Sequence, residues 1–109
     1  MDTGKDLIVV FITVPGREEG DKIGKMLVEE RLAACVNVLP GITSHYIWEG
    51  KLESSPEALL VVKTGANRFE QLRSRVLELH PYNVPEIIAI PIVAGDPGYL
   101  DWVRNSLNE

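Results

Sequence analysis

The chain has 109 residues, of which 45% are hydrophobic and 25% are charged, so it is long enough to bury one core without disulfides or a structural metal. This composition predicts one soluble globular domain over residues 1–109. The formal net charge of -5 has the wrong sign for a protein that binds a phosphate backbone, so we expect no nucleic-acid partner.

The first apolar run extends from Leu7 to Val14 and is rich in β-branched residues. It ends at the turn signal Pro15-Gly16, so it predicts a buried central strand. The run is far too short to cross a bilayer, and no signal-peptide pattern precedes it, so we expect a cytoplasmic protein with no membrane partner. The one cysteine, Cys35, fits a reducing compartment and excludes an intrachain disulfide.

The segment from Glu18 to Leu32 predicts the first helix, because apolar residues recur there at helical spacing with charged residues between them. Two strands follow, Ala34 to Trp48 and Lys51 to Thr64, and they are joined by a turn at Glu49-Gly50. Pro40-Gly41 interrupts the first of these strands, and we expect a bulge there. In the first predicted helix, the apolar positions are Ile23, Met26, Leu27 and Ala34.

A second helix is predicted from Asn67 to Leu79, with Asn67 as its N-cap. Its apolar face consists of Phe69, Leu72, Val76 and Leu79. The sequence EIIAIPIV, residues 86–93, then predicts the fourth strand.

The last helix is predicted to begin after Asp96-Pro97 and to continue through Leu107. Aspartate is a favourable N-cap, and proline is favourable at the first helical position. We assign Tyr99 and Trp102 to the apolar face of this helix.

The predicted order is strand, helix, strand, strand, helix, strand and a terminal helix, which is the ferredoxin-like α+β arrangement. Right-handed crossovers then predict an antiparallel sheet in the strand order 4-1-3-2, with both main helices on one face. The opposite face must be polar or be covered by another chain.

The hairpin formed by the second and third strands is too long for the core. About fifteen extended residues span roughly 50 Å, whereas a globule of this size is roughly 35 Å across. Its end should therefore project into solvent with Tyr46 and Trp48, and exposed strand edges of this kind pair with other subunits. We expect a homo-oligomer with Tyr46 and Trp48 at its interface, and packing rather than a binding cage is the favoured role of these aromatics.

Four stretches of the sequence together resemble the CutA family of divalent-cation tolerance proteins. They are EERLAACVNVLPGITSHYIWEGKLE, LLVVKT, HPYNVPEIIAIPI and GDPGYLDWV, in that order, and the resemblance covers almost the entire chain. It implies a ferredoxin-like fold in a tight homotrimer, a cytoplasmic location in bacteria, and tolerance to copper and other divalent metals. Trimers of similar build serve as PII signalling proteins, so a small-ligand sensor is a second implication.

The family's candidate metal ligands correspond to Cys35 and His80, while Ile12 and Leu79 occupy positions where some members carry a further cysteine and histidine. Thiolate and imidazole suit Cu²⁺ or Zn²⁺. In the predicted sheet, however, Cys35 and His80 lie near opposite edges and opposite ends. A shared metal site is therefore expected only across subunits, and no organic cofactor is implied.

Each candidate residue also has a structural interpretation. Cys35 can be a small buried hydrophobe, and His80 can be a cation at the negative end of a helix dipole, which Pro81 terminates. Lys63 can pair with Glu86 or with an anionic ligand, although a solvent-facing lysine is slightly favoured. We expect His80, Tyr82, Glu86 and Lys63 to contribute to a cleft or groove where subunits meet.

The leading functional hypothesis is a homotrimeric metal-binding protein of divalent-cation tolerance. The alternative is a PII-like sensor or scaffold that binds a small anion or metabolite between subunits and has no specific metal site. An enzyme is not expected, because Arg17 is the only echo of the anion-binding loop of ferredoxin-like acylphosphatases, and because Cys35 and His80 are too far apart to form a nucleophile pair within one chain.

Overall fold

The computed structural model describes residues 4–108 of the chain. The elements follow the predicted order, with a 3₁₀ turn added before the second main helix. They are β1 (Leu7–Val14), α1 (Arg17–Glu29), β2 (Cys35–Trp48), β3 (Lys51–Gly65), the 3₁₀ turn (Ala66–Arg68), α2 (Phe69–Leu79), β4 (Ile87–Pro91) and α3 (Pro97–Leu107). None of the helices in this described range is long and apolar enough to cross a membrane.

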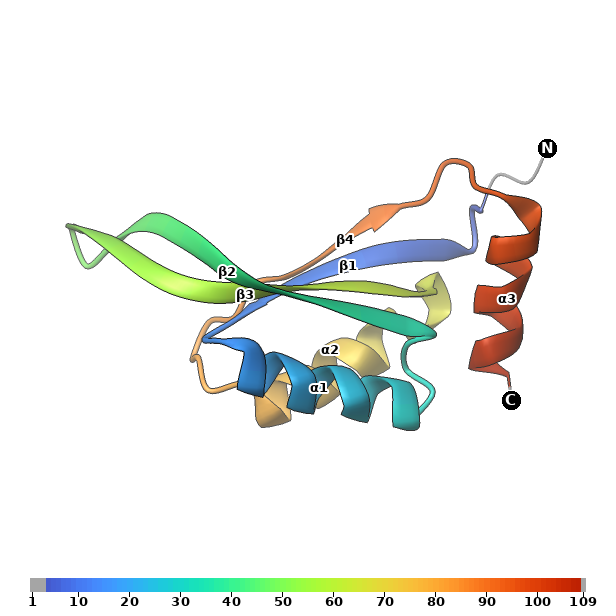
Figure 1. The fold of residues 1–109 in the computed structure, drawn as a ribbon, viewed down its shortest axis with the longest axis horizontal. Helices are drawn as coiled ribbons and strands as arrows, with labels where there is room; N and C mark the ends of the chain where they lie inside the picture. The colour runs from blue at the N-terminus through green and yellow to red at the C-terminus, as the bar shows by residue number, and fades with distance from the viewer. Residues whose placement is uncertain (1–3, 109) are drawn as a thin grey trace.

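The four strands form one antiparallel sheet in the order β2-β3-β1-β4, which is the predicted order 4-1-3-2 counted from the other edge. The ferredoxin-like α+β fold is thereby confirmed. Helices α1 and α2 lie side by side on one face of the sheet, and α3 stands across the end of the sheet where β1 begins (Figure 1).

The main core lies between the sheet and the two helices α1 and α2. Alternate residues of β1 point to this side, and Val10, Ile12 and Val14 are completely buried. Leu27 of α1 and Leu72 of α2 pack in the same cluster. α1 approaches β2 closely because of Gly24, where a Cβ atom would lie 3.1 Å from a methyl group of Val36.

A non-glycine residue in the left-handed conformation ends α1 earlier than the sequence pattern suggested. Arg31 has φ 60, and the N–H groups of Leu32 and Arg31 donate to the carbonyls of Leu27 and Val28 at 2.9 and 3.1 Å. These bonds satisfy carbonyls at the end of the helix. α1 therefore ends at Glu29 instead of continuing to Leu32.

The predicted N-cap of the second helix was wrong. Asn67 lies within the 3₁₀ turn, α2 begins at Phe69, and no side chain caps it. Tertiary contacts hold this segment instead. The N–H of Ala66 donates to Asp6 O at 2.8 Å, and the Arg68 guanidinium donates to Leu107 O at 2.9 Å.

Helix α3 packs its apolar stripe on Leu7 and Ala34, separately from the main core. The stripe is Leu100, Val103 and Leu107. Asp96 caps the helix as predicted and accepts a hydrogen bond from Tyr99 N at 3.1 Å. Tyr99 and Trp102, which we assigned to the apolar face of this helix, follow a neighbouring stripe and not the buried one. They are 42% and 48% exposed and stack with ring centroids 5.7 Å apart.

The β2-β3 hairpin projects from the core as predicted, and the molecule measures 47 × 26 × 23 Å (Figure 1). Its turn is tight because Glu49 and Gly50 both have positive φ, 50 and 80, as in a type I′ turn. The pairing register shifts between Leu39 and Ile42, which confirms the bulge expected at Pro40-Gly41.

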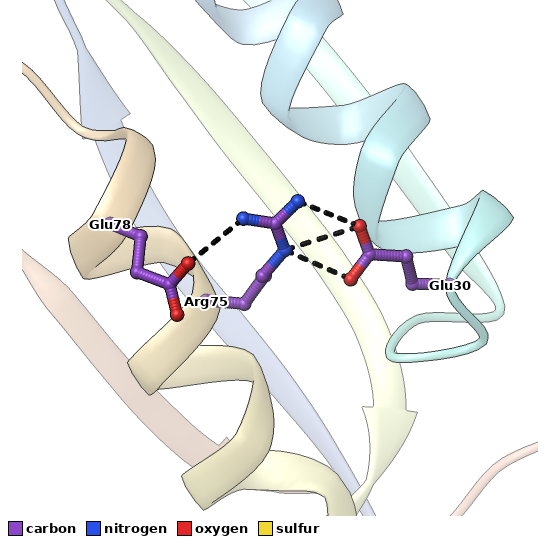
Figure 2. Close-up of polar contacts among 3 residues, drawn as sticks. All are labelled: Glu30, Arg75 and Glu78. Atoms are coloured by element: carbon purple, nitrogen blue, oxygen red, sulfur yellow. Dashed lines mark hydrogen bonds and ion pairs between the residues drawn. The ribbon is translucent and has the colours of Figure 1, made fainter.

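An ion-pair bridge joins the two main helices on the side away from the sheet (Figure 2). Arg75 of α2 donates from Nε and Nη2 to the Glu30 carboxylate just beyond α1, at 3.0 to 3.1 Å, and from Nη1 to Glu78 at 3.1 Å. The fork geometry favours one relative placement of the helices. The bridge is solvent-accessible, so its contribution to stability is small.

The sheet face opposite α1 and α2, which we call the open face, is largely apolar. Residues paired across strands share a face, as do alternate residues along a strand. The apolar members of the open face are Val9, Phe11, Leu39, Leu59, Val61, Ile88 and Ile90. Ile88 is 52% exposed and Ile90 is 45% exposed, so this face lacks a cover within the described chain.

Leu72→Ala and Leu77→Ala form a matched pair on α2. Leu72 is 0% exposed and Leu77 is 44% exposed. We expect Leu72→Ala to lower the free energy of unfolding by about 2–5 kcal/mol and Leu77→Ala by well under about 1 kcal/mol. Denaturant unfolding at equal protein concentration measures both. Equal losses would contradict the location of the core.

Candidate functional site

A cleft of about 660 Å³ lies at the base of the hairpin. It forms where the end of β1, the bulged hairpin and the loop between α2 and β4 come together. Such a volume is typical of a small-ligand site. The residues that line the cleft are Thr13, Ser44, His45, Tyr46, Trp48, Glu53, Glu57, Tyr82, Asn83, Val84 and Glu86.

His80 stands behind the cleft as a buried connection between the α2-β4 loop and β1. It is only 7% exposed. Nε2 lies 2.8 Å from Thr13 O, and Nδ1 accepts a hydrogen bond from Tyr82 N at 3.1 Å. Because a carbonyl can only accept and an amide N–H can only donate, the proton sits on Nε2 and the imidazole is neutral. His80 is therefore not the cation that we expected at the end of α2.

Glu57 and Tyr82 form the polar floor of the cleft. Glu57 is a charged residue only 8% exposed, and its Oε2 accepts a hydrogen bond of 2.8 Å from the Tyr82 hydroxyl. The rings of Tyr82 and His80 are in contact, with centroids 4.7 Å apart. Burial, and next the hydrogen bond and negative charge of Glu57, raise the pKa of Tyr82 to about 12.

The structure brings Tyr82 and Glu86 together in the cleft and places Lys63 elsewhere. Lys63 pairs with Val9 near the start of β1, and its ammonium donates to the side-chain oxygen of Asn37. Glu86 immediately precedes the β4 residues that pair with the far end of β1. The considered Lys63–Glu86 pair therefore does not form within one protomer, because the two residues lie at opposite ends of the sheet.

Cys35 and His80 also lie at opposite ends of the sheet. Cys35 pairs with Lys63, which pairs with Val9, whereas His80 contacts Thr13. Val9 and Thr13 are four positions apart on β1, which is roughly 13 Å along the strand. Cys35 and His80 are also separated across the strands. No group of three or more His, Cys, Asp or Glu side chains within residues 4–108 is placed to hold a metal ion.

The aromatic residues of the hairpin line the cleft as well as extending into solvent. Tyr46 is 42% exposed and Trp48 is 53% exposed. The Tyr46 hydroxyl hydrogen-bonds to Ser55 Oγ at 2.9 Å. These side chains are thus available both to a ligand and to a neighbouring subunit.

Glu57 is the site residue that the sequence reasoning missed. The available signal was a charged residue between Pro56 and the apolar run that begins at Ala58, in a segment predicted to be strand. Glu57 pairs with Ile42, which is the first pair on the hairpin side of the bulge. A carboxylate at such a position is buried only if a partner is supplied, and Tyr82 supplies it from a distant part of the chain.

The fold and the cleft define a ferredoxin-like α+β protein with a cavity of small-ligand size. Residues 8–106 match the family model described as CutA1 divalent ion tolerance protein. The chain is 55% identical over 98 residues to the divalent-cation tolerance protein CutA of Thermus thermophilus, and the match covers 90% of this chain and 95% of that protein. The chain therefore belongs to the CutA1 divalent ion tolerance family.

Two further relatives extend the comparison. The chloroplastic protein CutA of Arabidopsis thaliana is 52% identical over 99 residues, and the match covers 91% of this chain but 54% of that protein. The solved structure of the periplasmic divalent cation tolerance protein CutA from Archaeoglobus fulgidus has a TM-score of 0.90 at 42% identity, covering 93% of this chain and 98% of that one.

An alkaline titration tests the Tyr82–Glu57 contact. A pKa raised from 10.0 to about 12 means that Tyr82 contributes stability that is complete below pH 10 and is lost as the pH rises toward 12. Burial also raises the pKa of Tyr99, so the tyrosinate absorbance should contain more than one late step, and we assign the most alkaline step to Tyr82. Tyr82→Phe should remove it and Glu57→Gln should lower its pKa, whereas an unchanged curve in Tyr82→Phe would assign the late step to another residue.

Proposed function

We propose that the chain acts in divalent-cation tolerance as a cytoplasmic homotrimer that binds Cu²⁺ or Zn²⁺ between subunits and is not an enzyme. The observation that carries this proposal is the apolar open face. Antiparallel sheets covered on one side normally present polar residues on the other, and an exposed apolar surface of this kind indicates a protein interface. The number three is what the family resemblance implies, and the lone cysteine supports a reducing compartment.

The non-enzymatic assignment is supported by the state of the candidate catalytic groups. Both ring nitrogens of His80 are engaged in hydrogen bonds within the protomer, so His80 has no lone pair free to activate a nucleophile. Arg17 is highly exposed and lies 3.7 Å from Asp21, which is a surface ion pair and not an anion-binding loop.

A copper or zinc site on this protein would need ligands from more than one subunit. Copper and zinc sites need several converging nitrogen, sulfur or carboxylate ligands, and residues 4–108 of one chain do not present such a group. Cys35 is half-buried and shares the open face with Lys63 and Val9, so subunit contact can complete its coordination. His80 fits less well, since metal binding would cost it a hydrogen bond to Thr13 or Tyr82.

A small-ligand sensor is a second candidate function, and the cleft of about 660 Å³ favours it. The cleft lies at the base of the hairpin, and its hairpin residues Tyr46 and Glu53 form a cross-strand pair. Occupancy of the cleft could therefore alter how the hairpin meets a neighbouring subunit. This candidate requires no metal ligand.

A charge placed on the open face, compared with the same charge placed on α2, tests whether the open face is the oligomer interface. Ile88→Glu introduces a charge on the open face, and Leu77→Glu introduces the same charge on the outer surface of α2. We expect Ile88→Glu to weaken assembly by several kcal/mol, because a carboxylate would be buried without a partner, and Leu77→Glu to leave it intact. Sedimentation equilibrium measures the masses. A monomeric parent protein, or two variants that both assemble normally, would refute the interface.

Zinc calorimetry on the untagged assembled protein tests the metal proposal, because Zn²⁺ has no redox chemistry with the thiol. We expect Cys35→Ala to weaken binding by at least about tenfold. His80→Ala is measured beside it, together with its thermal stability, because the substitution removes the bonds to Thr13 and Tyr82. Equal weak binding by the parent and both variants would rule out these residues as ligands.

A further inference from the structure

The cleft at the base of the hairpin carries negative charge without a matching cation. Glu53, Glu57 and Glu86 all line it, and the described lining residues include neither lysine nor arginine. The net charge of the chain is also negative. Anionic ligands are therefore disfavoured electrostatically, and cationic ligands are attracted.

Glu57 offers a carboxylate oxygen to such a cation. The residue is 8% exposed, and Tyr82 is its one hydrogen-bond partner within residues 4–108, through Oε2. No buried side-chain oxygen or nitrogen of these residues lacks a hydrogen-bond partner, so the other carboxylate oxygen is accessible from the cleft. A ligand ammonium group can therefore bind it by a charge-assisted hydrogen bond.

Aromatic side chains form other parts of the cleft. Tyr46, Trp48 and Tyr82 line it. Aromatic faces attract ammonium groups and also pack against methylene chains. Glu53 pairs with Tyr46 across the hairpin, so a carboxylate and an aromatic ring lie on the same face of the hairpin.

The size of the cleft and the spread of its charges separate two kinds of cation. A bare metal ion needs ligands that converge on one point, and these carboxylates do not form such a group with any other described side chain. A cavity of about 660 Å³ is also much larger than an ion requires. A chain with several ammonium groups separated by methylenes matches both the dispersed carboxylates and the aromatic surfaces.

We propose that this cleft binds an aliphatic polyamine, with one ammonium group on Glu57, a second near Glu53 or Glu86, and the methylene chain against Tyr46, Trp48 and Tyr82. This inference names the ligand class of the sensor candidate and rests on it. It uses neither Cys35, which lies at the other end of the sheet, nor His80, whose ring nitrogens bond to Thr13 and Tyr82, so it does not depend on the metal proposal.

Calorimetric titration of the assembled protein with spermidine at constant ionic strength tests the proposal. We expect saturable binding that Glu57→Gln weakens by at least about tenfold, since a charge-assisted hydrogen bond becomes a neutral one. The amide oxygen introduced by Glu57→Gln can still accept from the Tyr82 hydroxyl, so the fold should survive. Glu86→Gln should weaken binding by a smaller factor, because this carboxylate is exposed.

Glu29→Gln is the matched control, because it removes the same charge from the far end of α1 and should leave binding unchanged. Absence of saturable binding, an equal loss in Glu29→Gln, or displacement of spermidine by Mg²⁺ at matched charge would each overturn the proposal. Glu57-dependent binding of ATP, used as an anionic probe, without binding of spermidine would overturn the polyamine assignment and leave the sensor candidate standing.

Discussion

The rest of the structure depends on β1 being the central strand of a sheet that is covered on one side only. β1 pairs with β3 along its whole length and with β4 over five residues. Its buried side chains hold α1 and α2 on one face. The other face is largely apolar, with Asn37 and Lys63 near one end of it, and α3 covers only its end through Leu7. Within residues 4–108, this layout buries the apolar residues of one sheet face and leaves much of the other face exposed.

The far end of β1 organises the cleft by a short series of contacts. Thr13 O accepts a hydrogen bond from His80 Nε2, and His80 Nδ1 accepts one from the N–H of Tyr82. The Tyr82 hydroxyl then donates to Glu57 of β3. The series joins β1, the α2-β4 loop and β3 through one neutral imidazole. It explains why a charged residue can be buried at the base of an exposed hairpin, and it gives His80 a structural role whether or not a ligand is present.

Much of the fold was predictable, and much less of the site was. Periodicity located every strand and main helix, and Pro40-Gly41, Glu49-Gly50 and Asp96-Pro97 marked the bulge, the turn and the last N-cap, because these features depend on local backbone chemistry. The N-cap at Asn67 failed because contacts from Asp6 and Leu107 hold that turn. The Lys63–Glu86 pair that the sequence allowed does not form within one protomer, since the level of Lys63 in the sheet depends on pairing with a distant strand.

The sequence by itself determined the strand order, the one-sided helix cover, the projecting hairpin and the family, because hydrophobic period, turn residues and motif order are local or collinear properties. Only the tertiary structure decided that Glu57 contacts Tyr82 and that both nitrogens of His80 are engaged in hydrogen bonds. Those facts depend on strand register and on contacts between residues up to 67 positions apart. No local pattern specifies such contacts, because chain folding brings these residues together only after each element has formed.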